Sequence, residues 1–219
     1  MRRDGLLASK KSGRRALYHL AGAFAGAFER ARRPALITPV TWQGSFHAVI
    51  YQVPERHRAF RDALRRTAML SGLGLLQPGL LLALRDPRAT LEPVLAVKPP
   101  PARVLFTSIV MELEDARGAA RTAWALPDLE AVYAGHIKCL RAALSRERAA
   151  PAATAETLRR FNRLARDPMS DMLRDPGLPP ELLPAAWTGP RLRDALAEVT
   201  ARFYPPAHTF VVERITSVS

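Results

Sequence analysis

Four basic residues gather around one expected turn near the start of the chain. Lys10, Lys11, Arg14 and Arg15 flank or lie within the Lys-Ser-Gly-Arg sequence at positions 11–14. Like charges crowded on a projecting turn repel one another unless an anion neutralises them. Lys and Arg contacts to phosphates position a protein on DNA without reading its sequence. These four residues are therefore the candidate DNA-phosphate-binding site, and a solvated basic turn is the alternative that the sequence leaves open.

Carboxylates are the second group that could do chemistry. Glu112, Glu114 and Asp115 cluster at the expected end of the last core strand. A metal-dependent nuclease needs carboxylates that converge on one ion. The expected first core strand has only Glu55 near its end, so we favour a binding protein and expect no enzymatic activity. A metal-dependent nuclease is kept as the lesser alternative.

No other pattern in the chain suggests catalysis, a metal site or a cofactor. The five histidines are far apart, which argues against a zinc site. The sequence has no G-x-S-x-G motif, no Walker loop and no G-x-G-x-x-G motif. The one cysteine, Cys139, falls in an apolar helical stripe, where we expect it to be buried and inert. With no second cysteine, no signal peptide and no long apolar run, a cytoplasmic protein without a membrane span is expected.

The basic turn must be held by a β-hairpin. Residues 6–9 and 16–20 are the expected strands, and Gly13 can adopt positive φ in the turn. Two strands alone are barely stable in water, so this hairpin needs a body to pack on. In a winged helix that body is three preceding helices, one of which reads the major groove. Residues 21–33 are expected to form a connector helix.

The middle of the chain predicts a ferredoxin-like β-α-β-β-α-β domain. Its helix opens at Glu55 after a first strand that ends near Pro54. Arg58, Arg61 and Arg65 recur on one face of this helix; they could contact phosphates, and a solvated face is the favoured alternative. The expected elements are strands at 46–53, 73–76, 80–84 and 104–113, with helices at 55–71 and 91–97.

From residue 114 onward the sequence predicts helices. Apolar residues keep three- and four-residue spacing from Leu126 to Leu144, and Thr154 is a plausible N-cap for the next helix. A proline-rich loop at 175–190 precedes a last long helix, and periodicity leaves residues 208–215 open between strand and helix. The chain is thus predicted to be an α+β protein with a wing hairpin and connector at 1–33, a ferredoxin-like domain at 34–113 and a helical domain at 114–219.

The net charge of +13 over 219 residues suggests an anionic partner, although the arginine-rich composition of proteins from GC-rich genomes could also produce it. The uneven distribution of the charge along the chain favours an anionic partner. Residues 1–33 hold nine basic and two acidic residues, a net charge of +7 in about a seventh of the chain.

Four segments resemble the PaaX-like family of transcriptional regulators. The first is the wing-like hairpin, and the second resembles a W-x-G…V-P-E-x-R core. The third resembles a W-x-L-x-x-L-x-x-Y helix, and the fourth a proline-rich motif ending in W-x-G. In this chain they read GLLASKKSGRRALYHL, WQGSFHAVIYQVPERHRAFRDALRRTAMLSGLGLLQPGLLLALRD, AWALPDLEAVYAGHI and DPGLPPELLPAAWTGPRLRDAL.

The resemblance implies a fold and a function. Family members have an N-terminal winged helix, a central ferredoxin-like domain and a helical C-terminal domain, and they are dimeric transcriptional regulators. The best-known branch represses phenylacetate-degradation operons and releases DNA when aryl-CoA thioesters bind. Operator DNA contacted through the wing, a homodimer, and an aryl-CoA or other acyl-CoA effector are therefore the implied partners. The sequence does not locate the effector-binding residues.

The chain departs from the family in two ways. Leu73 stands where the family usually has Phe, and Leu81 where it usually has Trp, so we expect a repacked core. The helices of the winged helix should precede the hairpin. We therefore expect an upstream start codon and a regulator that is incomplete at its N-terminus. The alternative is a DNA-free protein that keeps only dimerisation and effector sensing.

Overall fold

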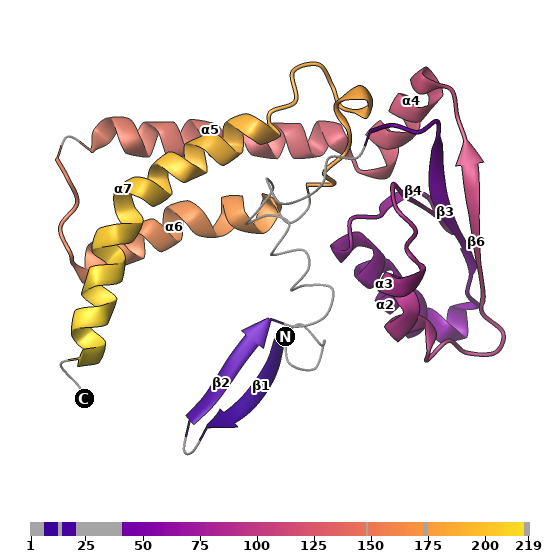
Figure 1. Cartoon of the computed structure of the whole chain (residues 1–219), viewed down its shortest axis with the longest axis horizontal. Coiled ribbons are helices and arrows are strands. Elements are labelled where there is room, and N and C mark those ends of the chain that lie inside the picture. Colours follow the sequence, from indigo (N-terminus) through magenta and orange to yellow (C-terminus); the bar gives the residue numbers. More distant parts are fainter. Residues whose placement is uncertain (1–6, 13–14, 21–40, 148, 173–174, 217–219) are drawn as a thin grey trace. The chain divides into compact units, whose positions relative to one another are not determined.

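A computed structural model describes residues 7–12, 15–20, 41–147, 149–172 and 175–216 (Figure 1). The chain divides into two compact units. The first comprises residues 1–126 and 173–185, and the second comprises residues 127–172 and 186–219. In the part of the chain that the structure describes, no helix combines the length and the apolar character needed to cross a bilayer.

The predicted hairpin is confirmed. Strands β1 (Leu7–Ser12) and β2 (Arg15–Leu20) pair in antiparallel fashion. The ladder continues to the pair Ser12–Arg15, so the first strand runs three residues beyond its predicted end. The two residues that join the strands, and the connector helix predicted at 21–33, lie outside the described residues.

The central part of the first unit has the predicted β-α-β-β-α-β order, which confirms the α+β class. The four strands lie in the order β4-β5-β3-β6, and every neighbouring pair is antiparallel, which is the ferredoxin-like arrangement. The elements are β3 (Ser45–Gln52), η2 (Glu55–His57), α2 (Arg58–Leu70), β4 (Gly74–Gln77), β5 (Leu80–Ala83), α3 (Arg88–Leu95) and β6 (Arg103–Val110).

One face of this sheet packs on α2 and α3. Side chains of a strand alternate between faces, and here Val49 and Leu81 point to the helices. They meet Leu64 of α2, which is fully buried. Leu73 and Leu81, the two expected departures from the family pattern, both lie buried in this core.

The other face is partly covered by α4 (Leu113–Ala123), whose buried residues are alanines. Small side chains let this helix approach β4 closely. Trp124, just after α4, donates a hydrogen bond from Nε1 to the carbonyl oxygen of Gly72 at 3.0 Å. The prediction that the last strand runs to residue 113 is wrong, because β6 ends at Val110 and Leu113 already begins α4.

The second unit is helical, as predicted. It contains α5 (Leu126–Arg146, whose first residue belongs to the other unit), α6 (Ala155–Met172) and α7 (Gly189–Thr216). Thr154 caps α6, because its Oγ1 accepts a hydrogen bond from the backbone N–H of Thr157 at 3.2 Å. Residues 208–215 prove to be helical, since α7 continues through Pro205 and Pro206. The helix changes direction along its length, as expected for a helix that contains prolines (Figure 1).

The proline-rich loop is ordered by the first unit. A short 3-10 turn, η3 (Pro180–Leu182), packs against α4, and Leu178 and Leu182 are buried. Arg117 of α4 donates from Nε to the carbonyl oxygen of Glu181 at 2.8 Å. The apolar positions between the prolines therefore anchor the loop.

Candidate nucleic-acid interface

The hairpin places three of the four predicted phosphate-binding residues on the rungs next to its turn. Lys10 is paired across the ladder with Leu17, Lys11 with Ala16, and Arg15 with Ser12. Three of the four predicted cations thus occupy the last three rungs before the turn. Arg14, the fourth, lies outside the described residues.

Two of the three cations predicted on α2, Arg58 and Arg61, are engaged by carboxylates. Arg61 donates from Nη1 to Oε2 of Glu55 at 2.7 Å, and Arg58 lies 3.4 Å from Asp62. The hydrogen bond from Arg61 holds the pKa of the Glu55 carboxyl below its ordinary value, and the same bond raises the pKa of Arg61. This pairing supports a solvated, internally compensated face for α2 rather than a phosphate-binding one.

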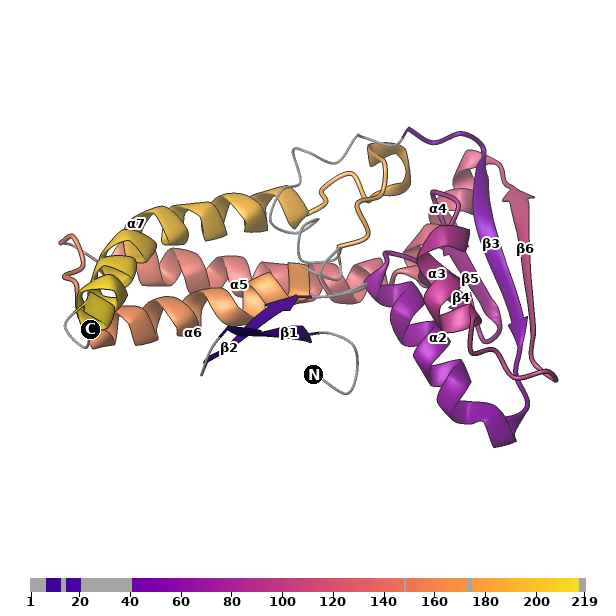
Figure 2. The same ribbon diagram turned by 60° about the horizontal axis from the view of Figure 1, so that its bottom comes forward.

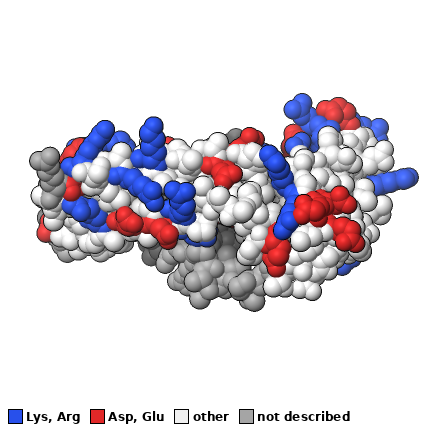
Figure 3. Space-filling view, turned by 90° about the horizontal axis from the view of Figure 1, so that it is seen from above, with Lys and Arg blue, Asp and Glu red and all other residues white. Residues whose placement is uncertain are grey.

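The described surface shows mixed charge on the face drawn in Figure 3. Blue Lys and Arg side chains alternate there with red Asp and Glu side chains, and no broad field of one sign forms. Nucleic-acid-binding proteins concentrate positive charge on one patch or stripe. Since residues 1–33 carry a net charge of +7, the hairpin end of the chain is the better candidate for such a patch.

The carboxylates considered for a nuclease do not meet. Glu55 follows the end of β3, and Glu112 follows the end of β6. These strands are antiparallel, with Gln52 paired to Arg103 and Ser45 paired to Val110. The two carboxylates therefore lie at opposite ends of the sheet, about 25 Å apart along the strands. Among the described residues, no group of three or more His, Cys, Asp or Glu side chains is placed to hold a metal ion.

The structure corrects the expectation for Cys139, which is exposed on α5. The apolar stripe of α5 runs through Tyr133, Ile137 and Leu140, all of which are buried. Cys139 stands two residues after Ile137 and one before Leu140, and this spacing turns it away from the stripe. Neighbouring an apolar residue in sequence is thus a poor guide to burial in a helix.

Two of the four family-like segments converge in the second unit. The ring of Tyr133, from the third segment, lies 5.6 Å from the ring of Trp187, from the fourth, measured between centroids. His136, one turn after Tyr133, places Nε2 2.8 Å from Oδ2 of Asp171 on α6. The His136–Asp171 pair joins residues 35 positions apart, and no local sequence pattern indicated it.

Comparison with known families accounts for these segments. The family model described as the PaaX protein central Cas2-like domain matches residues 39–112. The family model described as the PaaX-like protein C-terminal domain matches residues 124–213. The two matches follow one another in one chain and together span most of it. This chain belongs to the PaaX-like family. Members of the family are transcriptional regulators rather than enzymes, so the chain is a PaaX-like regulator in general terms.

The fold of this PaaX-like chain also resembles a solved structure. The structure is titled "Uncharacterized protein Rv0674 from Mycobacterium tuberculosis" and aligns with a TM-score of 0.61 at 20% sequence identity. The alignment covers 94% of this chain and 78% of the other. At that identity the similarity concerns the fold alone. No protein with a curated description matches the chain.

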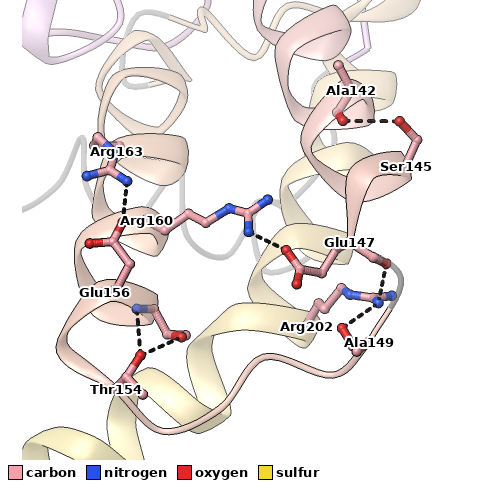
Figure 4. A network of polar contacts seen from close by, with 10 residues as sticks. Ala142, Ser145, Glu147, Ala149, Thr154, Glu156, Arg160, Arg163 and Arg202 are labelled. Atoms are coloured by element: carbon pink, nitrogen blue, oxygen red, sulfur yellow. Dashed lines mark hydrogen bonds and ion pairs between the residues drawn. The ribbon is translucent and has the colours of Figure 1, made fainter.

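A polar network that the sequence did not predict lies within the residues matched by the C-terminal domain (Figure 4). Glu147, just after α5, forms an ion pair with Arg160 of α6. Arg202 of α7 donates from Nη2 to the carbonyl oxygens of Glu147 at 2.6 Å and Ala149 at 3.1 Å. One short segment after α5 is thereby tied to both other helices of the PaaX-like C-terminal unit. Partners so far apart along the chain leave no local signal in the sequence.

Proposed function

We propose that this PaaX-like chain is a DNA-binding transcriptional regulator that contacts the backbone of operator DNA through the β1–β2 hairpin. Lys10, Lys11, Arg14 and Arg15 would supply contacts to phosphates that do not depend on sequence. The observation that carries the proposal is the register of the hairpin, which sets Lys10, Lys11 and Arg15 on successive rungs beside the turn. The concentration of positive charge in residues 1–33 supports it.

The proposed mode of regulation follows the family. We propose a cytoplasmic repressor that acts as a homodimer and leaves the operator when an aryl-CoA or another acyl-CoA effector binds. The effector would shift the population toward a conformation with lower operator affinity. The proposed domains are the hairpin and connector at 1–33, which would contact DNA, and the ferredoxin-like part at 34–113 and the helical part at 114–219, among which the effector would bind.

Charge reversal at the hairpin tests the proposal. The variant Arg14→Glu/Arg15→Glu should bind a double-stranded oligonucleotide of arbitrary sequence more weakly than the unaltered chain at low salt, because it neutralises fewer phosphates. The matched control is Lys138→Glu/Arg141→Glu, which changes the net charge equally at two exposed positions of α5. Fluorescence anisotropy measures the affinity. Equal weakening by both variants would show that only the net charge matters and would contradict a hairpin site.

The alternative is a DNA-free protein that dimerises and senses an effector. The mixed charge of the face in Figure 3 favours it, because that surface offers DNA no basic field. It predicts no retention on DNA at low salt and a rise in melting temperature with an acyl-CoA. Binding of the oligonucleotide by the unaltered chain would remove this alternative. The positions of Glu55 and Glu112 give a nuclease no support.

A further inference from the structure

Strand β6 forms one edge of the four-stranded sheet and is open on its outer side among the described residues. It is eight residues long, and from Val104 to Val110 it contains no charged residue and no proline. An edge strand exposes a row of unpaired N–H and C=O groups, and proteins protect such edges with charges, prolines, bulges or short length. None of these devices occurs between the two ends of β6.

The opposite edge of the same sheet is protected. Strand β4 is only four residues long, and its pairing with β5 is irregular between Leu75 and Gln77. Short length and irregular pairing both discourage the addition of another strand. The sheet therefore has one closed edge and one open edge, and a second sheet can be added only beside β6.

An apolar row leads to the open edge on the sheet face away from α2 and α3. Ile50 of β3 pairs with Leu80 of β5 on one side and with Leu105 of β6 on the other, so the three side chains lie side by side. Ile50 is 43% exposed and Leu105 is 61% exposed. The next row of this face, Ala48 and Leu82, is buried. The exposed row thus begins beyond the buried part of this face, which α4 partly covers, and it continues to the β6 edge.

We infer that the β6 edge and the row Leu80–Ile50–Leu105 form the interface of a homodimer, in which β6 pairs with β6 of a second copy to make one eight-stranded sheet. Antiparallel pairing of identical strands is self-complementary and places the same patch on both partners about a two-fold axis. The exposed row would then continue across the axis into the row of the other copy.

The charge distribution favours a second copy over other occupants. The chain carries a net charge of +13, so two copies repel each other on average. The stretch from Val104 to Val110 and the row Leu80–Ile50–Leu105 hold no charged residue, so two copies can approach there with less repulsion than elsewhere. The cations beside the strand are Arg103 at its first position and Arg88, whose guanidinium lies 5.3 Å from the centre of the Phe106 ring and pairs with Asp86, so an acidic partner would find no row of cations along the edge. With β4 closed, pairing also stops at two copies and does not continue into a fibre.

This interface deepens the proposed function, since a dimer would present two hairpins to one operator, and it can be tested without DNA. Light scattering after size-exclusion chromatography should give about twice the 24.2 kDa of one chain. Leu105→Lys should shift the mass to that of the single chain while circular dichroism stays unchanged. Val97→Lys, which adds the same charge at a residue 73% exposed outside the sheet, should remain dimeric.

Several results would overturn the inference. The unaltered chain could be monomeric at every concentration, Leu105→Lys could be as dimeric as the unaltered chain, or Val97→Lys could dissociate equally. Hydrogen exchange of the unaltered chain tests the strand pairing independently of any variant. Backbone amides of β6 should exchange more slowly at dimer-forming concentrations than on dilution, with no change in β4. If β6 exchange does not depend on concentration, the edge is not paired. A monomer that still binds DNA would refute the interface and leave the proposed function standing.

Discussion

Adding a methyl group at Gly74 should destabilise the first unit strongly. A Cβ built on Gly74 would lie 2.6 and 2.7 Å from Cδ2 and Cε2 of Trp124, and 2.8 Å from Cβ of Ala123. Ordinary contacts between carbon atoms are about 3.5–4.0 Å, so each overlap is roughly 1 Å. Trp124 is buried and fixed by its hydrogen bond to Gly72, and Ala123 belongs to α4, so neither can move aside without shifting the helix.

Overpacking of a filled core costs about 1–3 kcal/mol, and because these neighbours are fixed we expect Gly74→Ala to fall near the upper end, at about 3 kcal/mol. The same substitution at Gly118 is the matched control. Gly118 is exposed on α4, and nothing lies within 4 Å of its added Cβ. Gly118→Ala should stabilise the chain by about 0.5–1 kcal/mol through helix propensity.

Urea unfolding followed by tryptophan fluorescence and circular dichroism would measure both variants. The double variant Gly74→Ala/Trp124→Leu tests the cause, because a smaller side chain at position 124 makes room for the methyl group. The cost of Gly74→Ala should be smaller in that background, giving a favourable coupling energy. Equal stability of Gly74→Ala and the unaltered chain, or additive effects in the double variant, would refute the close packing of α4 on β4.

Three further substitutions probe the second unit and the turn that precedes α2. Thr154→Ala removes the cap of α6 and should cost about 1 kcal/mol in urea unfolding, while Thr154→Ser should cost little; equal costs would contradict the cap. Arg202→Met removes the donor to the last carbonyls after α5 and should cost roughly 1–3 kcal/mol, because those carbonyls lose a charged partner. Glu55→Gln removes the carboxylate whose pKa Arg61 lowers. That pair stabilises the fold above the unfolded-state pKa of about 4.3, and the contribution is lost as the pH falls through the lower pKa of the folded state. Acid titration should therefore show a smaller loss of stability below about pH 4 in Glu55→Gln, and an unchanged profile would contradict the pairing.

Much of the architecture could be predicted because the local signals agreed with one another. Apolar runs separated by Pro54, Gly72 and the Pro78-Gly79 pair match the strand and helix order of the sheet, and Thr154 indicated the start of α6. Each of these residues acts on the backbone where it stands, through a fixed φ, a positive φ or a side-chain cap.

The errors fall where no such residue marks a boundary. The end of β6 lies three residues before its predicted position, because Met111, Glu112 and Leu113 continue the sequence without a glycine or proline and the start of α4 at Leu113 ends the strand instead. Pro205 and Pro206 present the opposite difficulty. Proline usually ends a helix, and here α7 continues through both residues.

The functional residues divide in the same way. The cations of the hairpin could be found because they are adjacent in sequence and charged. The network of Glu147, Arg160 and Arg202 and the pair of His136 and Asp171 could not, because only the packing of three helices brings them together. The open edge of β6 likewise depends on the strand order, which a single strand does not reveal.

The central claim is that the β1–β2 hairpin lies on DNA phosphates, and the salt dependence of DNA affinity tests it most directly. The logarithm of the association constant should fall linearly with the logarithm of the salt concentration, by about 0.9 for each phosphate that the protein neutralises. The account predicts that Arg14→Glu/Arg15→Glu flattens this slope by about 0.9 for each phosphate that the altered hairpin leaves free, while Lys138→Glu/Arg141→Glu leaves it unchanged. A hairpin variant whose slope equals that of the unaltered chain would contradict the claim.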